Sequence, residues 1–244
     1  MLRLLTLNVG LSRGRFGPWS DRLEVAAEAI RRADPDVALL QAVERRPRNG
    51  TETDQAADLA AGLGAGWHAS FVAAADRHDG SAVGTAWLSR APLAIDHRRL
   101  TLLTPDEDPN PRVVSYANVR GVTVWNTYFS WVEAQARRNV EETLEAIGEE
   151  PGAAVVAGDF NCAPQNSALD LLRRRGWTDV WEKLRPSDDG LTFFENGRLA
   201  KRIDYVWASP ALASRLGSID RIAVDPGSGG YRVSDHAGLV VSIT

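Results

Sequence analysis

The chain has 244 residues, of which 44% are hydrophobic and 25% charged, an ordinary composition for a folded globular protein. No stretch approaches the roughly 18 apolar residues of a membrane-spanning helix, so we expect no association with a membrane. The net charge of −4 argues against a non-specific binder of nucleic acid, because such proteins are normally basic.

The chain contains one cysteine, Cys162, which excludes an internal disulfide and a zinc site built from several thiolates. We expect Cys162 to be a small buried side chain. Met1–Val9 reads as a strand and has no small-residue cleavage site. These features predict a cytoplasmic protein without a secretory signal. The eight tryptophans could stack on a substrate, although core packing is the simpler expectation.

Short apolar runs bounded by Gly, Pro, Asp and Asn predict buried strands, and segments with a period near 3.6 residues predict helices between them. In chain order we expect a strand at 2–9, a helix at 21–33, a strand at 36–43, a helix at 53–63, a strand at 81–89, strands at 113–119 and 121–129, a helix at 133–147, a strand at 153–160, a helix at 167–175, and strands at 202–209 and 239–243.

Turn and loop residues complete this pattern. Arg120 and Gly121 lie between two apolar runs and predict a hairpin turn, and Ser167 is a candidate helix N-cap. The expected loops are Arg13–Ser20, Pro47–Thr53, Pro105–Pro111, Pro186–Gly190 and Asp225–Arg232. Hairpin neighbours mixed with helical crossovers indicate an α/β fold, a two-sheet sandwich of mixed sheets with helices outside. We expect one domain spanning residues 1–244.

Polar side chains recur at the ends of the predicted strands. They are Asn8, Asp159, Asn161, Asp204, Asp235 and His236. Burying a carboxylate is costly unless it is paired or binds a metal, and several converging carboxylates repel one another. A divalent cation would remove that repulsion, and oxygen ligands from Asp and Asn suit Mg²⁺ or Mn²⁺. Such a cluster is suited to the hydrolysis of a phosphate ester.

Each motif also has a simpler interpretation. The segment GDFN, which contains Asp159, could be a strand followed by an Asx turn. The segment SDH could place His236 on the surface after a helix-cap residue, and RIDY could carry an exposed Asp204. The conjunction of these motifs in one order is the more informative signal.

The order LNVG, DVALLQ, GTAWLSR, WNTYF, VVAGDFN, KRIDYVWAS and SDHAGLVV resembles the endonuclease/exonuclease/phosphatase family from residue 2 to residue 243. This family includes exonuclease III-like and DNase I-like nucleases and several phosphodiesterases. The resemblance implies a DNase I-like fold and a metal-dependent phosphoric ester hydrolase. It also implies Mg²⁺ or Mn²⁺ as cofactor.

The resemblance implies a catalytic role for five residues. Asp159 would be the general base for the attacking water, and Asn161 would orient both Asp159 and the phosphate. Asp204 would orient His236, whose imidazole would bind the scissile phosphate oxygen. Tyr128 stands where many members have a histidine that protonates the leaving group, although exonuclease III-like members have tyrosine there. Its phenol could therefore donate to the phosphate, or it could be a packed strand residue.

The resemblance also implies substrate and metal contacts. Asn8 would contact the phosphate or the metal shell, Asp235 would serve the metal, and Arg112 could reach the phosphate. The glutamate that is the family's main metal ligand is replaced here by Ala42. Glu44 follows two residues later and could substitute if the strand bulges. Otherwise it would be a surface carboxylate.

Two functional hypotheses follow. The first is a monomeric phosphoesterase that hydrolyses a phosphodiester or phosphomonoester, with nucleic acid as one potential substrate. A small ester suits the acidic balance better than duplex DNA. The second is a repurposed family member, a binding protein or an enzyme for another reaction, in which hydrolysis is lost or weak because of Ala42.

Overall fold

The computed structural model describes residues 1–12, 16–48, 51–76, 78–227 and 229–244. Within these residues the strands form two large mixed sheets and one small hairpin. The first large sheet has the order β14 (Leu216–Ile222), β15 (Gly238–Ile243), β1 (Leu2–Asn8), β2 (Val37–Arg48), β5 (Ala82–Ser89) and β4 (His68–Asp76), and β3 (Thr51–Asp54) pairs with β2. The second has the order β10 (Thr178–Asp179), β13 (Asp204–Ala208), β9 (Ala154–Asp159), β8 (Val122–Tyr128), β7 (Arg112–Val119) and β6 (Asp96–Leu100). The hairpin pairs β11 (Phe193–Glu195) with β12 (Arg198–Lys201).

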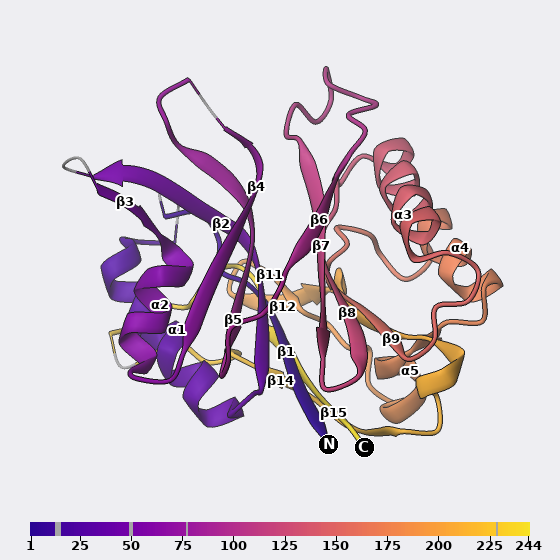
Figure 1. Ribbon diagram of the computed structural model, residues 1–244. Helices are drawn as coiled ribbons and strands as arrows, with labels where there is room; N and C mark the ends of the chain where they lie inside the picture. The colour runs from indigo at the N-terminus through magenta and orange to yellow at the C-terminus, as the bar shows by residue number, and fades with distance from the viewer. Residues whose placement is uncertain (13–15, 49–50, 77, 228) are drawn as a thin grey trace.

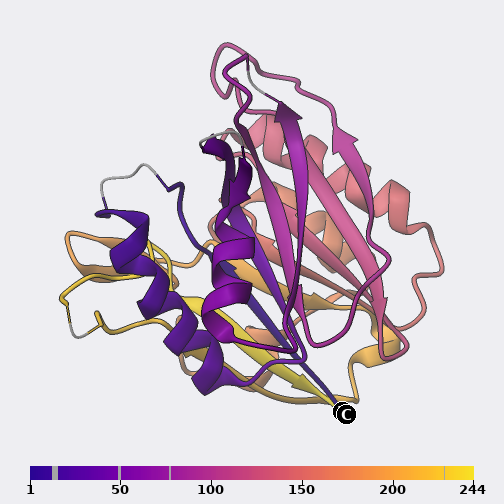
Figure 2. The same cartoon turned by 60° about the vertical axis from the view of Figure 1, so that its left-hand side comes forward.

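The two large sheets face each other, and helices cover their outer faces (Figure 1). Helices α1 (Trp19–Ala33) and α2 (Gln55–Leu63) lie on the first sheet, where Ala26, Ala27 and Ile30 pack on strand residues, and Figure 2 brings the side with these two helices forward. Helices α3 (Glu133–Ile147) and α4 (Ser167–Arg174) lie on the second sheet. The shorter α5 (Val180–Leu184) and a 3₁₀ turn (Pro210–Leu212) contribute to the inter-sheet core. The molecule is therefore the predicted two-sheet α/β sandwich.

The layer between the sheets changes from apolar to polar along its strands. Alternate residues of a strand face the same side. In β1, Leu2 and Leu4 belong to the inter-sheet core, whereas Thr6 bonds to a side chain of the neighbouring strand and Asn8 reaches the opposite sheet. The inward-facing residues of β2, β8, β9 and β13 also become polar at this same end of the sandwich. They are Gln41, Asn126, Tyr128, Asp159 and Asp204. The sequence thus builds a dry core at one end and a polar site at the other.

The hairpin at Arg120–Gly121 is confirmed, and both residues have positive φ, 53° and 81°, as a tight two-residue turn requires. The expected loop Pro47–Thr53 is wrong, because β2 continues to Arg48 and pairs with β3, although residues 49–50 lie outside the described part. The expected N-cap Ser167 is also wrong. Asn166 caps α4 by accepting a hydrogen bond from the Ala168 amide at 2.9 Å.

The remaining loop predictions fare differently from one another. Residues 13–15 of the expected loop Arg13–Ser20 lie outside the described residues, and Trp19 and Ser20 belong to α1. Residues 105–111 and 186–190 lack helix and strand, as expected, and so do residues 225–227 and 229–232 of the last expected loop, whose residue 228 lies outside the described residues. Cys162 is buried, as predicted. None of the described helices is long and apolar enough to cross a membrane.

Candidate active site

Asp159 lies at the junction of the two sheets. It ends β9, and a hydrogen bond of 2.8 Å from Asn8 Nδ2 connects it to the end of β1 in the opposite sheet. Gly158 has a φ of 147°, and a Cβ at this position would lie 2.0 Å from the Thr127 carbonyl oxygen. Glycine therefore allows β9 to approach β8 closely, just before the carboxylate.

Asn161 holds the same carboxylate from the loop that follows β9. Its backbone N–H donates to Asp159 Oδ1 at 2.8 Å, which is an Asx turn, and its side-chain amide lies 3.3 Å from Asp159 Oδ2. The φ of Asn161 is 51°, a left-handed conformation that asparagine tolerates better than most residues. The turn interpretation of GDFN and its functional interpretation are thus compatible.

His236 is held by a carboxylate behind its ring. Its Nδ1 lies 2.9 Å from Asp204 Oδ2, and its Nε2 lies 3.8 Å from Asp159 Oδ2 and 3.7 Å from Asp235 Oδ1. Asp204 reaches this place because β13 pairs with β9 in a register that sets Asp204 opposite Asp159. His236 and Asp204 are both buried, so the interpretations as a surface histidine and an exposed aspartate are wrong.

The neighbours of this pair fix its backbone. Ser234 Oγ accepts a hydrogen bond from the His236 amide at 3.0 Å, and Thr192 Oγ1 accepts one from the Asp204 amide at 3.2 Å. The Phe193 ring meets the imidazole edge-on, with centroids 5.1 Å apart. The β11–β12 hairpin therefore packs against the site, a contribution that the sequence motifs did not indicate.

The pKa values of Asp159 and His236 are both raised, but by different causes. Burial raises the pKa of Asp159 to about 7; His236 opposes this rise and Asp204 adds to it. Burial alone would lower the pKa of His236, but the carboxylates of Asp204 and Asp159 reverse the effect and raise it to about 9. The imidazole thus favours its charged form at neutral pH, whereas Asp159 is suited to exchanging a proton near pH 7.

Arg112 forms a second cluster, at the start of β7. Its Nη2 donates to Asp108 Oδ2 at 2.6 Å, and the Ser130 hydroxyl donates to the same oxygen at 2.5 Å. Its guanidinium carbon lies 4.6 Å from the Tyr128 ring centroid and 5.2 Å from that of Trp131. The buried Nε and Nη1 of Arg112 have no hydrogen-bond partner among the described residues. Two buried donors of a cation, held in place by neighbours, are suited to binding an anion.

Tyr128 connects this cluster to the first. It lies opposite Asp159 in the parallel pairing of β8 with β9, and it is partly exposed. Burial raises the pKa of Tyr128, and the positive charge of Arg112 opposes this rise. The phenol therefore keeps its proton at neutral pH and is available as a donor.

Strand β2 bulges at Ala42. The pairing of β2 with β5 shifts between Leu40 and Val43, and Ala42 has a φ of 53°. Glu44 beyond the bulge is buried, where Ser12 Oγ donates to its Oε2 and Arg46 pairs with its Oε1. The alternative of a surface carboxylate is therefore wrong, while a ligand role for Glu44 remains a prediction.

The described residues contain one group that meets the geometric requirements of a metal site. Asp159, Asp204 and His236 each offer a ligand atom, and these atoms lie within 4.8 Å of one another. The two buried carboxylates, Asp159 and Asp204, offer oxygen atoms that suit a divalent cation, whereas His236 could act as a ligand only after its imidazolium loses its proton. Asp235 adds a carboxylate at the edge of this group, whereas Glu44 lies outside it.

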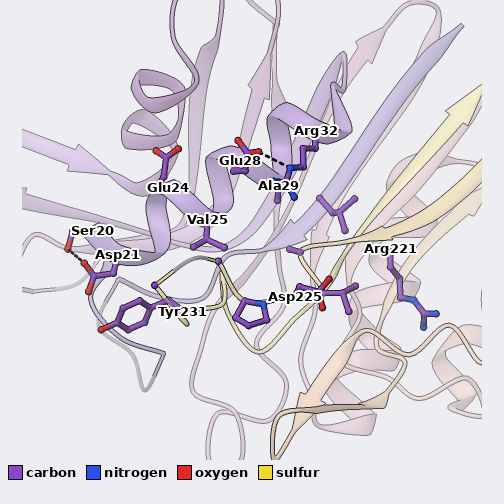
Figure 3. Close-up of a pocket in the computed structure, with 16 residues that line it drawn as sticks. Ser20, Asp21, Glu24, Val25, Glu28, Ala29, Arg32, Arg221, Asp225 and Tyr231 are labelled. Atoms are coloured by element: carbon purple, nitrogen blue, oxygen red, sulfur yellow. Dashed lines mark hydrogen bonds and ion pairs between the residues drawn. The ribbon is translucent and has the colours of Figure 1, made fainter.

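Two cavities help to locate the substrate region. One of about 520 Å³ is lined by Arg112 and Tyr128. A groove of about 920 Å³ runs between α1 and residues 221–227, 229 and 231, and Figure 3 shows Glu28 paired with Arg32 on its helical side and Tyr231 and Asp225 on its loop side. This groove contains none of the residues that the sequence motifs predict, so the cavity beside Arg112 is the better candidate.

A family model, Endonuclease/Exonuclease/phosphatase family, matches residues 5–236. The chain belongs to the endonuclease/exonuclease/phosphatase family. None of the curated proteins compared with this chain matches it.

Solved structures of family members show the same fold over the whole chain. An endonuclease/exonuclease/phosphatase family protein from Leptotrichia buccalis C-1013-b is 18% identical with a TM-score of 0.78, and the match covers 100% of both chains. A 3′ phosphatase from Neisseria, bound to a product DNA hairpin, is 21% identical with a TM-score of 0.71 and equal coverage of 100%. A mannosyl-6-phosphatase from Bacteroides thetaiotaomicron VPI-5482 is 18% identical with a TM-score of 0.75, again covering 100% of both chains. At these identities the likeness establishes the fold.

Sequence reasoning missed several residues that orient the predicted ones. Asp108 and Ser130 position Arg112, and Ser12 holds Glu44. Asp108 lies in an expected loop, where only its position four residues before Arg112 could have suggested a partner. No periodic signal marks Ser12 or Ser130.

Proposed function

We propose that this family member is a metal-dependent phosphoesterase that hydrolyses a phosphodiester or phosphomonoester with water activated by Asp159. The observation that carries the proposal is the paired geometry of His236 and Asp159. One imidazole nitrogen is fixed by Asp204 at 2.9 Å, and the other lies 3.8 Å from the buried carboxylate. The family's phosphatases and nucleases support this reading.

Each residue has a proposed task. Asp159 removes a proton from water, which its raised pKa favours near neutrality. The His236 imidazolium binds a phosphate oxygen and stabilises negative charge in the transition state. Asn161 orients Asp159, and Tyr128 donates a hydrogen bond to the phosphate or the leaving oxygen.

Four further residues would hold the metal or the phosphate. Asp235, Asn8 and Glu44 supply oxygen atoms suited to Mg²⁺ or Mn²⁺. Such an ion, when bound, supplies positive charge that neutralises the phosphate. Asn8 also orients Asp159, and Arg112 binds the phosphate through its two unpartnered nitrogens.

Ala42 supports a second candidate, a repurposed family member with weak or lost hydrolysis that binds a ligand or performs another reaction. Its methyl group stands in the bulge of β2, where the family resemblance places a metal-binding glutamate, and a methyl group cannot bind a cation. Retention of the buried cluster around Asp159 favours the phosphoesterase.

The test is hydrolysis of bis-p-nitrophenyl phosphate, p-nitrophenyl phosphate and an abasic-site duplex, with Mg²⁺, with Mn²⁺ and with EDTA. We expect metal-dependent activity that falls about 100- to 10,000-fold in Asp159→Asn, because the general base is lost. Asp170→Asn is the matched control, since Asp170 pairs with Arg173 on helix α4. Absence of hydrolysis with every metal would instead support the repurposed protein.

A further inference from the structure

The cavity of about 520 Å³ beside Arg112 lies between the two sheets. One wall is formed by the end of β4 and the start of β5, with Ala74, Ala75 and Val83, and the other by residues 109–113 with Tyr128 and Trp131. Figure 1 shows these segments at the same end of the sandwich. The volume lies in the range of about 300–1,000 Å³ that small-molecule sites occupy.

Positive charge reaches this cavity from a single arginine. Arg112 is the sole arginine or lysine among its described lining residues, and two of its buried nitrogens lack partners. Asp108 is occupied with Arg112, Ser130 and Asn110, while Asp76 pairs with Arg45 at 3.0 Å. An anion therefore has one charged place to bind in this cavity.

Trp131 gives the same cavity an aromatic surface. Its side chain is 53% exposed, although the molecule buries most of its large apolar side chains. The Arg112 guanidinium lies 5.2 Å from the Trp131 ring centroid, next to the proposed phosphate position. The facing wall has small residues at Ala74 and Ala75, which leave room for a flat group, with Asp76 and His78 beside them.

From this arrangement we propose that the cavity binds the organic part of the substrate, a single compact group that carries a ring and stacks on Trp131 while its phosphate binds Arg112. The proposal rests on the proposed phosphoesterase function and names its substrate class. A polynucleotide duplex is the poorer match, because tight binding of DNA needs many phosphate contacts and this cavity offers one buried arginine.

The test is calorimetric binding of phenylphosphonate and methylphosphonate, which share an anionic head and resist hydrolysis, with Mg²⁺ and again with EDTA. We expect phenylphosphonate to bind about threefold to tenfold more tightly, the range of one aromatic contact. Trp131→Leu should abolish this preference. Trp67→Leu should preserve it, because Trp67 precedes β4 at the opposite end, packs under Arg90, and does not line the cavity.

Ala75→Leu supplies a second variant, which narrows the opposite wall and should weaken phenylphosphonate while leaving methylphosphonate unchanged. Equal binding of the two phosphonates to the wild type, or a preference that survives both cavity variants, overturns the proposal. The phosphonates report on the cavity without turnover. If the wild-type protein hydrolyses phosphate esters but binds the two phosphonates equally, the ring-binding cavity is rejected and the proposed function stands. If it prefers phenylphosphonate but hydrolyses no ester, the proposed function is rejected and the ring-binding cavity stands.

Discussion

The charge of His236 depends on the carboxylate behind it, and this dependence predicts a pH profile. The pKa of His236 is raised to about 9, so the imidazolium persists through neutral pH and is lost as the pH rises past that value. Asp159 must be ionised to act as a base, so activity should fall as the pH drops below about 7. We expect a bell-shaped dependence of kcat/KM on pH.

Asp204→Asn should move the alkaline limb of this profile to lower pH by about 1–2 units, because the lost negative charge no longer favours the imidazolium. NMR titration of His236 without metal gives a readout that is independent of activity. The other three histidines, His68, His78 and His97, are exposed, and a His236→Gln variant identifies the buried signal. An unchanged His236 titration in Asp204→Asn would refute the proposed coupling.

At the scale of elements, the bulge in β2 determines which groups can reach a metal. Glu44 is buried beyond the bulge with Ser12 and Arg46 as partners, and Ala42 occupies the bulge itself. If Glu44 is a ligand, Glu44→Gln should weaken Mn²⁺ binding about tenfold or more, because an amide is a poorer donor for a hard cation. Glutamine preserves the shape and the contact with Ser12.

The complementary variant is Ala42→Glu, which adds a carboxylate at the position of the family's main ligand. We expect Mn²⁺ affinity, measured by electron paramagnetic resonance of the free ion, to increase. Unchanged affinity in Glu44→Gln together with an increase in Ala42→Glu would assign Glu44 a structural role. A thermal melt of each variant serves as the control for folding.

The elements that could be predicted from the sequence are those whose own residues bury an apolar surface. The strands around Leu4, Val124 and Val156 and the amphipathic helices all belong to this class. The strands that the sequence did not predict are β3, β4, β6, β10, β11, β12 and β14. Two of them, β6 and β12, are largely exposed and are held in a sheet by their partner strands. Pairing energy between distant segments has no local signature in a single sequence.

The residues of the candidate site also fall into two groups, those that the predicted strand ends indicated and those that they did not. Asn8, Asp159 and Asp204 were predictable because each ends or begins a buried strand, and strand register then brings them together. The contacts of Arg112 with Asp108 and of Glu44 with Ser12 depend on loop paths and on a bulge. Loop conformation is set by such tertiary contacts, so these partners could not be identified from spacing alone.

At the scale of the whole molecule, a buried polar contact joins the two sheets below the site. Gln41 of β2 donates to Asn126 Oδ1 at 2.8 Å across the sandwich, and the Asn126 amide donates to the Ala86 carbonyl at 2.9 Å. Gln41 Nε2 also donates to Thr6 Oγ1 at 3.0 Å, which adds Thr6 to the network. All three polar side chains are buried, and their hydrogen bonds come from one another and from the carbonyls of Leu39, Leu40 and Ala86.

This network predicts an unequal response to two substitutions. Asn126→Leu removes the shortest hydrogen bond of Gln41 and leaves that amide with Thr6 and the Leu39 carbonyl, and we expect a loss of about 1–3 kcal/mol in the free energy of unfolding. Adding Gln41→Met removes the buried amide that lost this bond, so the double variant should recover part of that loss. Urea denaturation followed by tryptophan fluorescence measures both, because Trp87 and Trp207 are buried in different sheets. If the double variant lost as much stability as the sum of the two single variants, the Gln41 and Asn126 amides would not be energetically coupled, and the prediction would be wrong.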